Sequence, residues 1–130
     1  ITRGAMASTV AHDAHNLLVI GTNDADMALA ANTLIECGGG MCAVQDGKVL
    51  GCVPLPLAGL MNPQPCEEMS RLVEKLDAAW KQIGCDIVSP FMTMALISLA
   101  CLPEVRLTNR GLVDCTKFQF VPLEVEKENQ

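Results

Sequence analysis

The sequence contains few aromatic residues and no concentration of positive charge. Tyrosine is absent, and the chain of 130 residues has three phenylalanines and one tryptophan. This composition offers no platform on which unpaired nucleic-acid bases could stack. The nine lysines and arginines form no cluster and the net charge is −6, so the attraction to phosphate that nucleic-acid binding needs is also missing. We therefore expect no nucleic-acid partner.

Long hydrophobic runs and targeting segments are missing as well. The longest apolar run covers residues 91–102, is interrupted by Thr93 and Ser98, and is too short for a membrane-spanning helix. No secretion signal is visible in the first residues. We expect no membrane partner and a cytoplasmic location.

The cysteines are numerous but unpaired in sequence. Seven are scattered singly and no CxxC motif occurs, which excludes the paired spacing of a zinc ribbon or a thiol redox motif. We expect free thiols that pack as small hydrophobic side chains in a reducing compartment. No disulfide and no metal bound within this chain are expected.

Hydrophobic residues, by contrast, are abundant. They make up 50% of the sequence, and charged residues make up 18%, which argues against disorder. A chain of this length fits one domain with its own core, so we treat residues 1–130 as a single domain. Some apolar surface should face another domain or a second copy, and a homo-oligomer is one option.

Two hydrophobic periodicities alternate in the first half of the chain. Short apolar runs predict strands at residues 16–21, 41–45 and 48–53. Asp46-Gly47 favours a tight hairpin turn between the last two, and Asn23 or Thr22 caps a helix over residues 24–37. Apolar side chains recur along that helix at Met27, Ala31, Leu34 and Ile35. Residues 1–11, rich in small side chains, are interpreted as a lead-in segment.

The clearest predicted element is a second helix, over residues 65–83. Glu67 and Glu68 lie in its first turn and Gly84 ends it. Its apolar stripe comprises Met69, Leu72, Val73, Leu76, Ala79, Trp80 and Ile83, and we expect Trp80 to be buried. Residues 91–100 fit a buried strand or a buried helix.

The C-terminal part adds shorter elements and completes the fold prediction. A short strand is predicted at residues 105–107, a turn at 109–111 and a half-exposed strand at 117–121, followed by a charged tail from Glu124. The order of elements indicates the α/β class, with α+β as the alternative: one domain, with helices packed on a mixed β-sheet.

One dense polar cluster precedes the first predicted strand. It comprises His12, Asp13, His15 and Asn16, and the two histidines are the only ones in the sequence. Imidazole and carboxylate groups serve in acid–base catalysis and as metal ligands. In an extended segment, however, His12 and His15 would point to opposite faces. A polar loop that only bonds to nearby backbone is the structural alternative.

Two further segments have uncommon compositions. The run Gly38-Gly39-Gly40 follows a helix instead of preceding one, so it is wrongly placed for a phosphate-binding loop, and a helix stop is favoured. Residues 54–62 form an apolar, proline-containing loop. This loop either packs on a neighbouring domain or lines a pocket, or else it merely covers the core.

Residues 4–24, GAMASTVAHDAHNLLVIGTND, resemble the start of the C-terminal domain of adenine deaminases of the metal-dependent amidohydrolase superfamily. The resemblance continues in register along nearly the whole chain, through Asp26-Met27-Ala28, residues 38–40, 46–49 (DGKV), 54–61 (PLPLAGLM), 90–93 (PFMT), 108–114 (TNRGLVD) and 118–123 (FQFVPL). One departure is Ala14, where the family pattern has serine.

The resemblance implies part of a larger enzyme that hydrolyses adenine to hypoxanthine and ammonia. A (β/α)₈ barrel of the same polypeptide would be the partner of this domain and would hold a divalent metal, manganese or iron. The superfamily's His-x-His motif is missing here, so we expect no metal and no deamination by this chain alone. We expect the segment from Ser8 to Asn16 to lie at the edge of the barrel's active site. There Asp13 and His15 would be catalytic, because a carboxylate and an imidazole can support proton transfer, and His12 and Asn16 would bind adenine through their donors and acceptors.

Three functions therefore stay open at this point. The domain could complete or cover a deaminase active site, it could serve only packing and oligomerisation, or it could bind a small molecule autonomously. The environment of His12, Asp13, His15 and Asn16 distinguishes these possibilities.

Overall fold

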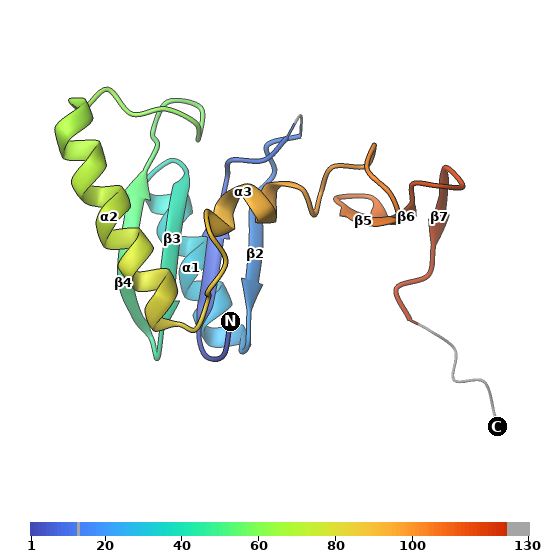
Figure 1. The fold of residues 1–130 in the computed structure, drawn as a ribbon, viewed down its shortest axis with the longest axis horizontal. Helices are drawn as coiled ribbons and strands as arrows, with labels where there is room; N and C mark the ends of the chain where they lie inside the picture. Colours follow the sequence, from blue (N-terminus) through green and yellow to red (C-terminus); the bar gives the residue numbers. More distant parts are fainter. Residues whose placement is uncertain (13, 125–130) are drawn as a thin grey trace.

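The computed structural model describes residues 1–12 and 14–124 (Figure 1). The strands are β1 (Ala5–Ser8), β2 (Leu18–Gly21), β3 (Gly40–Gln45), β4 (Lys48–Pro54), β5 (Val105–Thr108), β6 (Gly111–Asp114) and β7 (Gln119–Val121). The helices are α1 (Asp24–Glu36), α2 (Cys66–Gln82) and α3 (Pro90–Ala95). Within the described residues, no helix has the length and apolar character needed to cross a membrane.

The larger sheet has the strand order β2-β1-β3-β4, and every pairing in it is antiparallel. The prediction of a mixed sheet is therefore wrong, although the fold class is confirmed in its α+β form. The strands β2 and β3, which α1 joins, do run parallel to each other. They are not neighbours, because β1 lies between them and pairs antiparallel with both.

The strand β1 also corrects the interpretation of residues 1–11 as a lead-in segment. Ala5, Met6, Ala7 and Ser8 are all buried in the interior of the sheet. Three of these four side chains are very small, so the segment carries no hydrophobic periodicity that predicts a strand. Their small size instead lets α1 lie close to the sheet, where Ala5 and Ala7 pack with Ala30 and Leu34.

Alternate residues of the sheet face two different helices, as the two-residue period of a strand requires. On one face Ala5, Ala7, Cys42 and Val44 pack with α1. On the other, Met6, Met41, Ala43 and Val53 pack with residues of α2, including Leu76 and Trp80. The sheet is therefore the middle of three layers, and Figure 1 shows α1 and α2 on opposite sides of it.

The first helix begins and ends as predicted, but its buried face differs. Asn23 caps it by accepting a hydrogen bond at Oδ1 from the Asp26 backbone N–H, at 2.8 Å. Asp26, Ala30 and Leu34 form the buried stripe. Ile35, predicted to lie on that stripe, is instead 69% exposed, because it lies just outside the helix face that the sheet covers.

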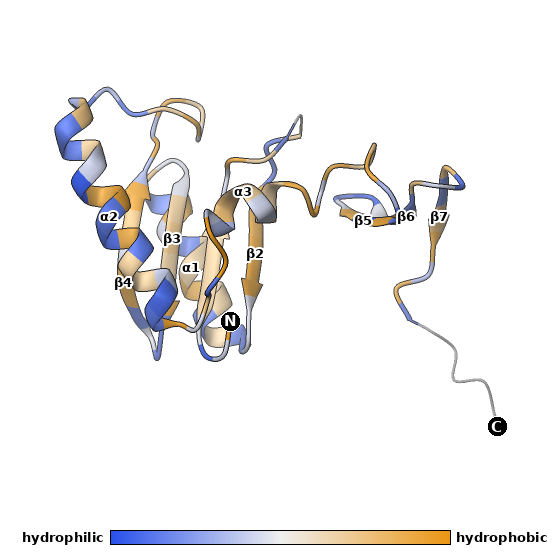
Figure 2. Ribbon diagram, viewed as in Figure 1, coloured by the Kyte–Doolittle hydropathy of each residue, from blue (hydrophilic) through white to orange (hydrophobic). Residues whose placement is uncertain are grey.

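The β3–β4 hairpin and the helix α2 form where the sequence predicts them. Asp46 and Gly47 have φ angles of 54° and 71°, the left-handed conformation that a tight hairpin turn of this kind requires. Leu76, Ala79 and Trp80 are buried on the inner face of α2, which confirms the predicted stripe and the burial of Trp80. Figure 2 shows hydrophilic and hydrophobic colours alternating along this helix.

The ambiguous segment at residues 91–100 resolves into the short helix α3 and a series of turns. After it, β5, β6 and β7 form a second antiparallel sheet. The sequence predicted β5 and β7 but missed β6, because only Leu112 and Val113 mark that strand as apolar. Figure 1 shows this C-terminal sheet standing to one side of the larger sheet.

Candidate functional site

The connection from β1 to β2, residues 9–17, holds the predicted polar cluster and is called the polar loop below. Thr9 fixes its start: the Thr9 hydroxyl donates to the carbonyl of Gly59 at 2.7 Å and accepts from the Gly40 N–H at 2.8 Å. A Cβ atom at Gly39 would collide with the Cα of Gly59. The glycines therefore let the 54–62 segment approach the polar loop.

His15 occupies a backbone conformation that is uncommon for its residue type. Its φ angle is 47°, in the left-handed region that few non-glycine residues adopt. The imidazole Nδ1 accepts a hydrogen bond from the Ala11 N–H at 3.3 Å, which helps hold the turn. The side chain is exposed and lines a hollow of about 260 Å³ with Ile35, Ala58 and Gly59 among its neighbours.

His12 and Asn16 line a different hollow, of about 420 Å³. Its other wall comes from the segment after α3 and from the C-terminal sheet, and it comprises Ser98, Leu99, Ala100, Cys101, Thr108, Asn109 and Phe118. Both polar side chains are exposed. Their donors and acceptors, together with those of Asn109, line a hollow that also contains an exposed aromatic ring.

The structure therefore divides the predicted cluster. His12 and Asn16 are brought together on one hollow, and His15 lies on the other, in agreement with the expectation that the two histidines face apart. Asp13 lies outside the described residues. The structure also shows why the loop turns here, since the Ala14 N–H donates to the His12 carbonyl at 2.8 Å.

An apolar surface lies beside the hollow that contains His15. Ile35 is 69% exposed, Met61 is 61% exposed and Leu57 is 48% exposed. Ile35 lines the same hollow as His15, and Ala58 and Gly59 of the neighbouring segment line it too. The 54–62 segment therefore does more than cover the core, since it presents apolar side chains to solvent next to the polar loop.

The metal implied by the family resemblance finds no ligand set in this part of the protein. Among residues 1–12 and 14–124, no group of three or more His, Cys, Asp or Glu side chains is placed to hold a metal ion. The polar loop contributes two histidines that face different hollows. No catalytic step by a metal can be assigned to the described residues.

Three cysteines gather between the end of α1 and the sheet. Cys37 and Cys52 have their sulfur atoms 3.9 Å apart, and Cys42 is fully buried beside them. Burial raises the pKa of the Cys42 and Cys52 thiols to about 12, and the nearby Cys37 adds to the effect at Cys52. These two thiols are therefore protonated at neutral pH and pack as apolar groups.

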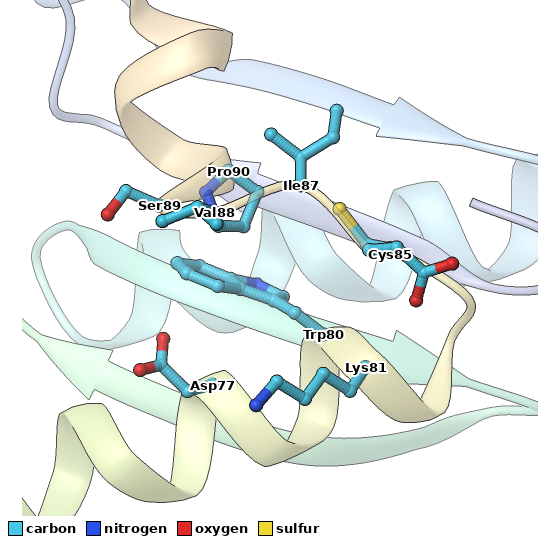
Figure 3. Close-up of a pocket in the computed structure, with 9 residues that line it drawn as sticks. Asp77, Trp80, Lys81, Cys85, Ile87, Val88, Ser89 and Pro90 are labelled. Atoms are coloured by element: carbon cyan, nitrogen blue, oxygen red, sulfur yellow. The ribbon is translucent and has the colours of Figure 1, made fainter.

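A further cavity, of about 300 Å³, lies at the C-terminal end of α2 (Figure 3). Figure 3 shows Trp80 beneath Pro90, with Asp77 and Lys81 on the helix beside it. The Trp80 ring also packs on Phe91, with 5.5 Å between ring centroids. No residue that the sequence singled out for chemistry lines this cavity, and the packing indicates a structural role in holding α3 on α2.

Sequence reasoning missed the residues that complete the two hollows. Ala58 and Gly59 reach His15 from a segment more than forty residues away, and Asn109 and Phe118 reach His12 from the C-terminal sheet. Positive φ angles at Ala58 and Phe118 leave no clear trace in residue type. The one available signal was the apolar composition of residues 54–62.

These observations define the class of protein: a three-layer α+β domain with an exposed polar loop and apolar surface at one end of its sheet. The comparison with protein families is specific. The chain belongs to the adenine deaminase C-terminal domain family, which matches residues 1–119. The resemblance carried by residues 4–24 and the later motifs is thereby confirmed.

Curated relatives are named accordingly. A protein named adenine deaminase from Clostridium botulinum is 83% identical over 127 residues, which are 98% of this chain and 21% of that protein. Proteins of the same name from Moorella thermoacetica and Bdellovibrio bacteriovorus are 63% and 47% identical, over 92% and 95% of this chain and 20% and 21% of their own length. The chain thus spans about one fifth of the length of these relatives.

Proposed function

We propose that this domain is the C-terminal part of a longer polypeptide that hydrolyses adenine to hypoxanthine and ammonia. The observation that carries the proposal is 83% identity, over 98% of the chain, to a protein named adenine deaminase. A metal-bearing barrel of the same polypeptide is the partner domain. The cytoplasmic location expected from the sequence belongs to the same proposal.

In this proposal the polar loop lies at the edge of the barrel's active site and helps close it against water. The exposed apolar side chains of Ile35, Leu57 and Met61 beside the loop support contact with a neighbouring domain at this end of the sheet. A loop held by rigid strands on both sides suits such a role. Closure strengthens electrostatic interactions around the reacting atoms.

The reaction adds water to the adenine carbon that bears the exocyclic amine, breaks the C–N bond and releases ammonia. When bound in the barrel, the divalent metal, manganese or iron, supplies activation of that water. His12 and Asn16 offer donors and acceptors for the polar edge of adenine. Asp13 and His15 pass a proton from the attacking water to the leaving nitrogen. Because His15 lines a different hollow from His12 and Asn16, this role requires the polar loop to turn His15 toward the same substrate when it closes.

Two measurements on the full-length polypeptide test this function. Ammonia should be released from adenine with manganese or iron present, and the 130-residue chain alone should release none. Adenine should also slow backbone amide exchange in residues 9–17, because a closed loop opens less often, while exchange in α2 stays unchanged as the control. Metal-dependent turnover by the isolated chain, or unaltered exchange in the loop, would show that the proposal is wrong.

A non-catalytic packing role is the second candidate. The exposed Ile35, Leu57 and Met61 favour it equally, because they need only a partner surface and no substrate. Under this alternative the polar loop bonds to its own backbone, as the His15–Ala11 contact does. The full-length enzyme would then keep its activity when the side chains of the loop are changed.

A further inference from the structure

The C-terminal sheet has little support from the rest of the described chain. No helix or strand outside it packs extensively on β5, β6 or β7 among the described residues. One backbone hydrogen bond joins it to the segment after α3, from the Leu107 N–H to the Ile97 carbonyl at 3.1 Å. In Figure 1 the sheet stands apart from the three layers of the main body.

The strand register gives this sheet one face on which four of six side chains are apolar, the other two being Asp114 and Gln119 in the row of Val105. Leu107 lies opposite Leu112, and Leu112 lies opposite Val121. Residues directly opposite each other in antiparallel strands share a face, so these three side chains form one row across the sheet. Val105, two residues before Leu107, lies on the same face. Its exposed fraction is 43%, and that of Leu107 is 42%.

The opposite face is more polar. Arg106, Val113 and Phe120 form its central row, and the Arg110 guanidinium lies over the Phe120 ring at 5.5 Å from the centroid. Arg110 partly covers Phe120, which is still 56% exposed. The four apolar side chains of the first face, Val105, Leu107, Leu112 and Val121, are called the apolar face below.

Short strands of three or four residues need a packed hydrophobic face for stability in water. An exposed apolar row on such a sheet therefore marks a surface that another protein surface covers. The chain spans about one fifth of the length of its curated relatives. A longer polypeptide of that kind supplies a partner at high effective concentration, without the association cost of a separate protein.

We infer that the apolar face of the C-terminal sheet docks onto an apolar surface in the part of the longer polypeptide outside residues 1–130. The inference rests on the proposed function only in taking the chain as part of a longer polypeptide. The position of the face supports it: Leu107 lines a cavity of about 150 Å³ with Asn16, Leu17 and Leu18 at the end of the polar loop. One neighbouring surface can thus cover both the sheet and the loop.

The test compares the full-length polypeptide with the 130-residue chain. In the full-length polypeptide, amides of residues 105–108 and 111–114 should exchange at least about tenfold more slowly than in the chain alone, because docking suppresses local opening. Val105→Thr should reduce that protection in the full-length polypeptide and leave exchange in the chain alone unchanged, because threonine keeps the shape and strand preference of valine and places no charge opposite Asp114. Val88→Thr is the matched control, since Val88 is 89% exposed and lies outside the sheet, and it should change neither.

Three outcomes would overturn the inference. These are equal exchange rates in the two proteins, an equal effect of Val105→Thr and Val88→Thr on exchange in the full-length polypeptide, and protection that appears in the 130-residue chain together with a concentration-dependent dimer. The last would assign the face to a second copy. None of these readouts depends on deaminase activity, so failure of docking is distinguishable from failure of the proposed function.

Discussion

The Asp26 carboxylate joins the start of α1 to the tip of the β3–β4 hairpin. It accepts hydrogen bonds from Asn23 Nδ2 at 2.9 Å, from the Gly47 N–H at 2.8 Å and from the Asp46 N–H at 3.1 Å. The hydrogen bond from Asn23, followed by that from Gly47, lowers the pKa of Asp26 below its ordinary value of 3.8. One buried side chain thus satisfies donors from two elements that are twenty residues apart.

Acid should therefore remove a stabilising contribution of Asp26. Because its pKa is lower in the folded state, that contribution is complete above pH 3.8 and is lost as the pH falls through the folded-state pKa. We expect Asp26→Asn to lower the urea midpoint at pH 7, and the gap between variant and wild type to shrink toward pH 2–3.

Asp24→Asn is the control for this titration, because Asp24 also lies in the first turn of α1 but is exposed. It should lower the midpoint less at pH 7, since an exposed charge near a helix terminus contributes little. A gap for Asp26→Asn that stays constant from pH 7 to pH 2 would show that the carboxylate charge is not involved.

At the scale of elements, α2 provides the core of one side of the sheet. Leu76 is 1% exposed and packs in the cluster that contains Trp80 and Ile83. Loss of the leucine contacts alone costs about 2–5 kcal/mol, and an unpaired buried carboxylate costs more. Since domains are stable by about 5–15 kcal/mol, Leu76→Asp should leave the domain largely unfolded in circular dichroism.

Ala78→Asp is the matched control on the same helix. Ala78 is exposed, so the new carboxylate stays in water and the cost is limited to helix propensity, roughly 0.7 kcal/mol. A folded Leu76→Asp domain with the stability of Ala78→Asp would show that this face of α2 is not the core.

Elements with local signals could be predicted from sequence, and elements defined by distant contacts could not. The turn at Asp46-Gly47 and the stripe of α2 depend on residues close in sequence, and both predictions were correct. The strand β1 was missed because its alanines carry no periodicity, and that omission also made the sheet look mixed. The position of Ile35 outside the buried face depends on how α1 sits on the sheet, which its sequence spacing does not specify.

The candidate site shows the same limit. The polar loop was identified by its residue types. His12 and His15 do lie on different hollows, as expected, but the cause is a turn in which His15 has a φ of 47°, and not the extended strand that the expectation assumed. The walls of the two hollows come from Ala58 and Gly59 on one side and from Asn109 and Phe118 on the other. These contacts form only when the chain folds, so no pattern near the loop could indicate them.

At the scale of the whole molecule, exposed apolar side chains lie next to the exposed polar side chains of the polar loop. The polar loop is flanked by Ile35, Leu57 and Met61 on one side and by the C-terminal sheet on the other. Within the described residues no metal-ligand set is present. In the proposed function, the domain contributes loop residues to a site whose metal is held elsewhere in the polypeptide.

The most direct measurement of that role is kcat/KM for adenine in the full-length polypeptide with His15→Asn. Asparagine tolerates the left-handed backbone of His15, and its side-chain oxygen can accept the Ala11 N–H in place of Nδ1, so the fold should be preserved. We predict a decrease of at least about tenfold, or roughly 1.4 kcal/mol, at an unchanged melting temperature. Asp13→Asn should act similarly, and His12→Asn should mainly raise KM. Full activity of a folded His15→Asn enzyme would contradict a catalytic role for the loop, and a parallel loss of activity and melting temperature would assign His15 to holding the turn.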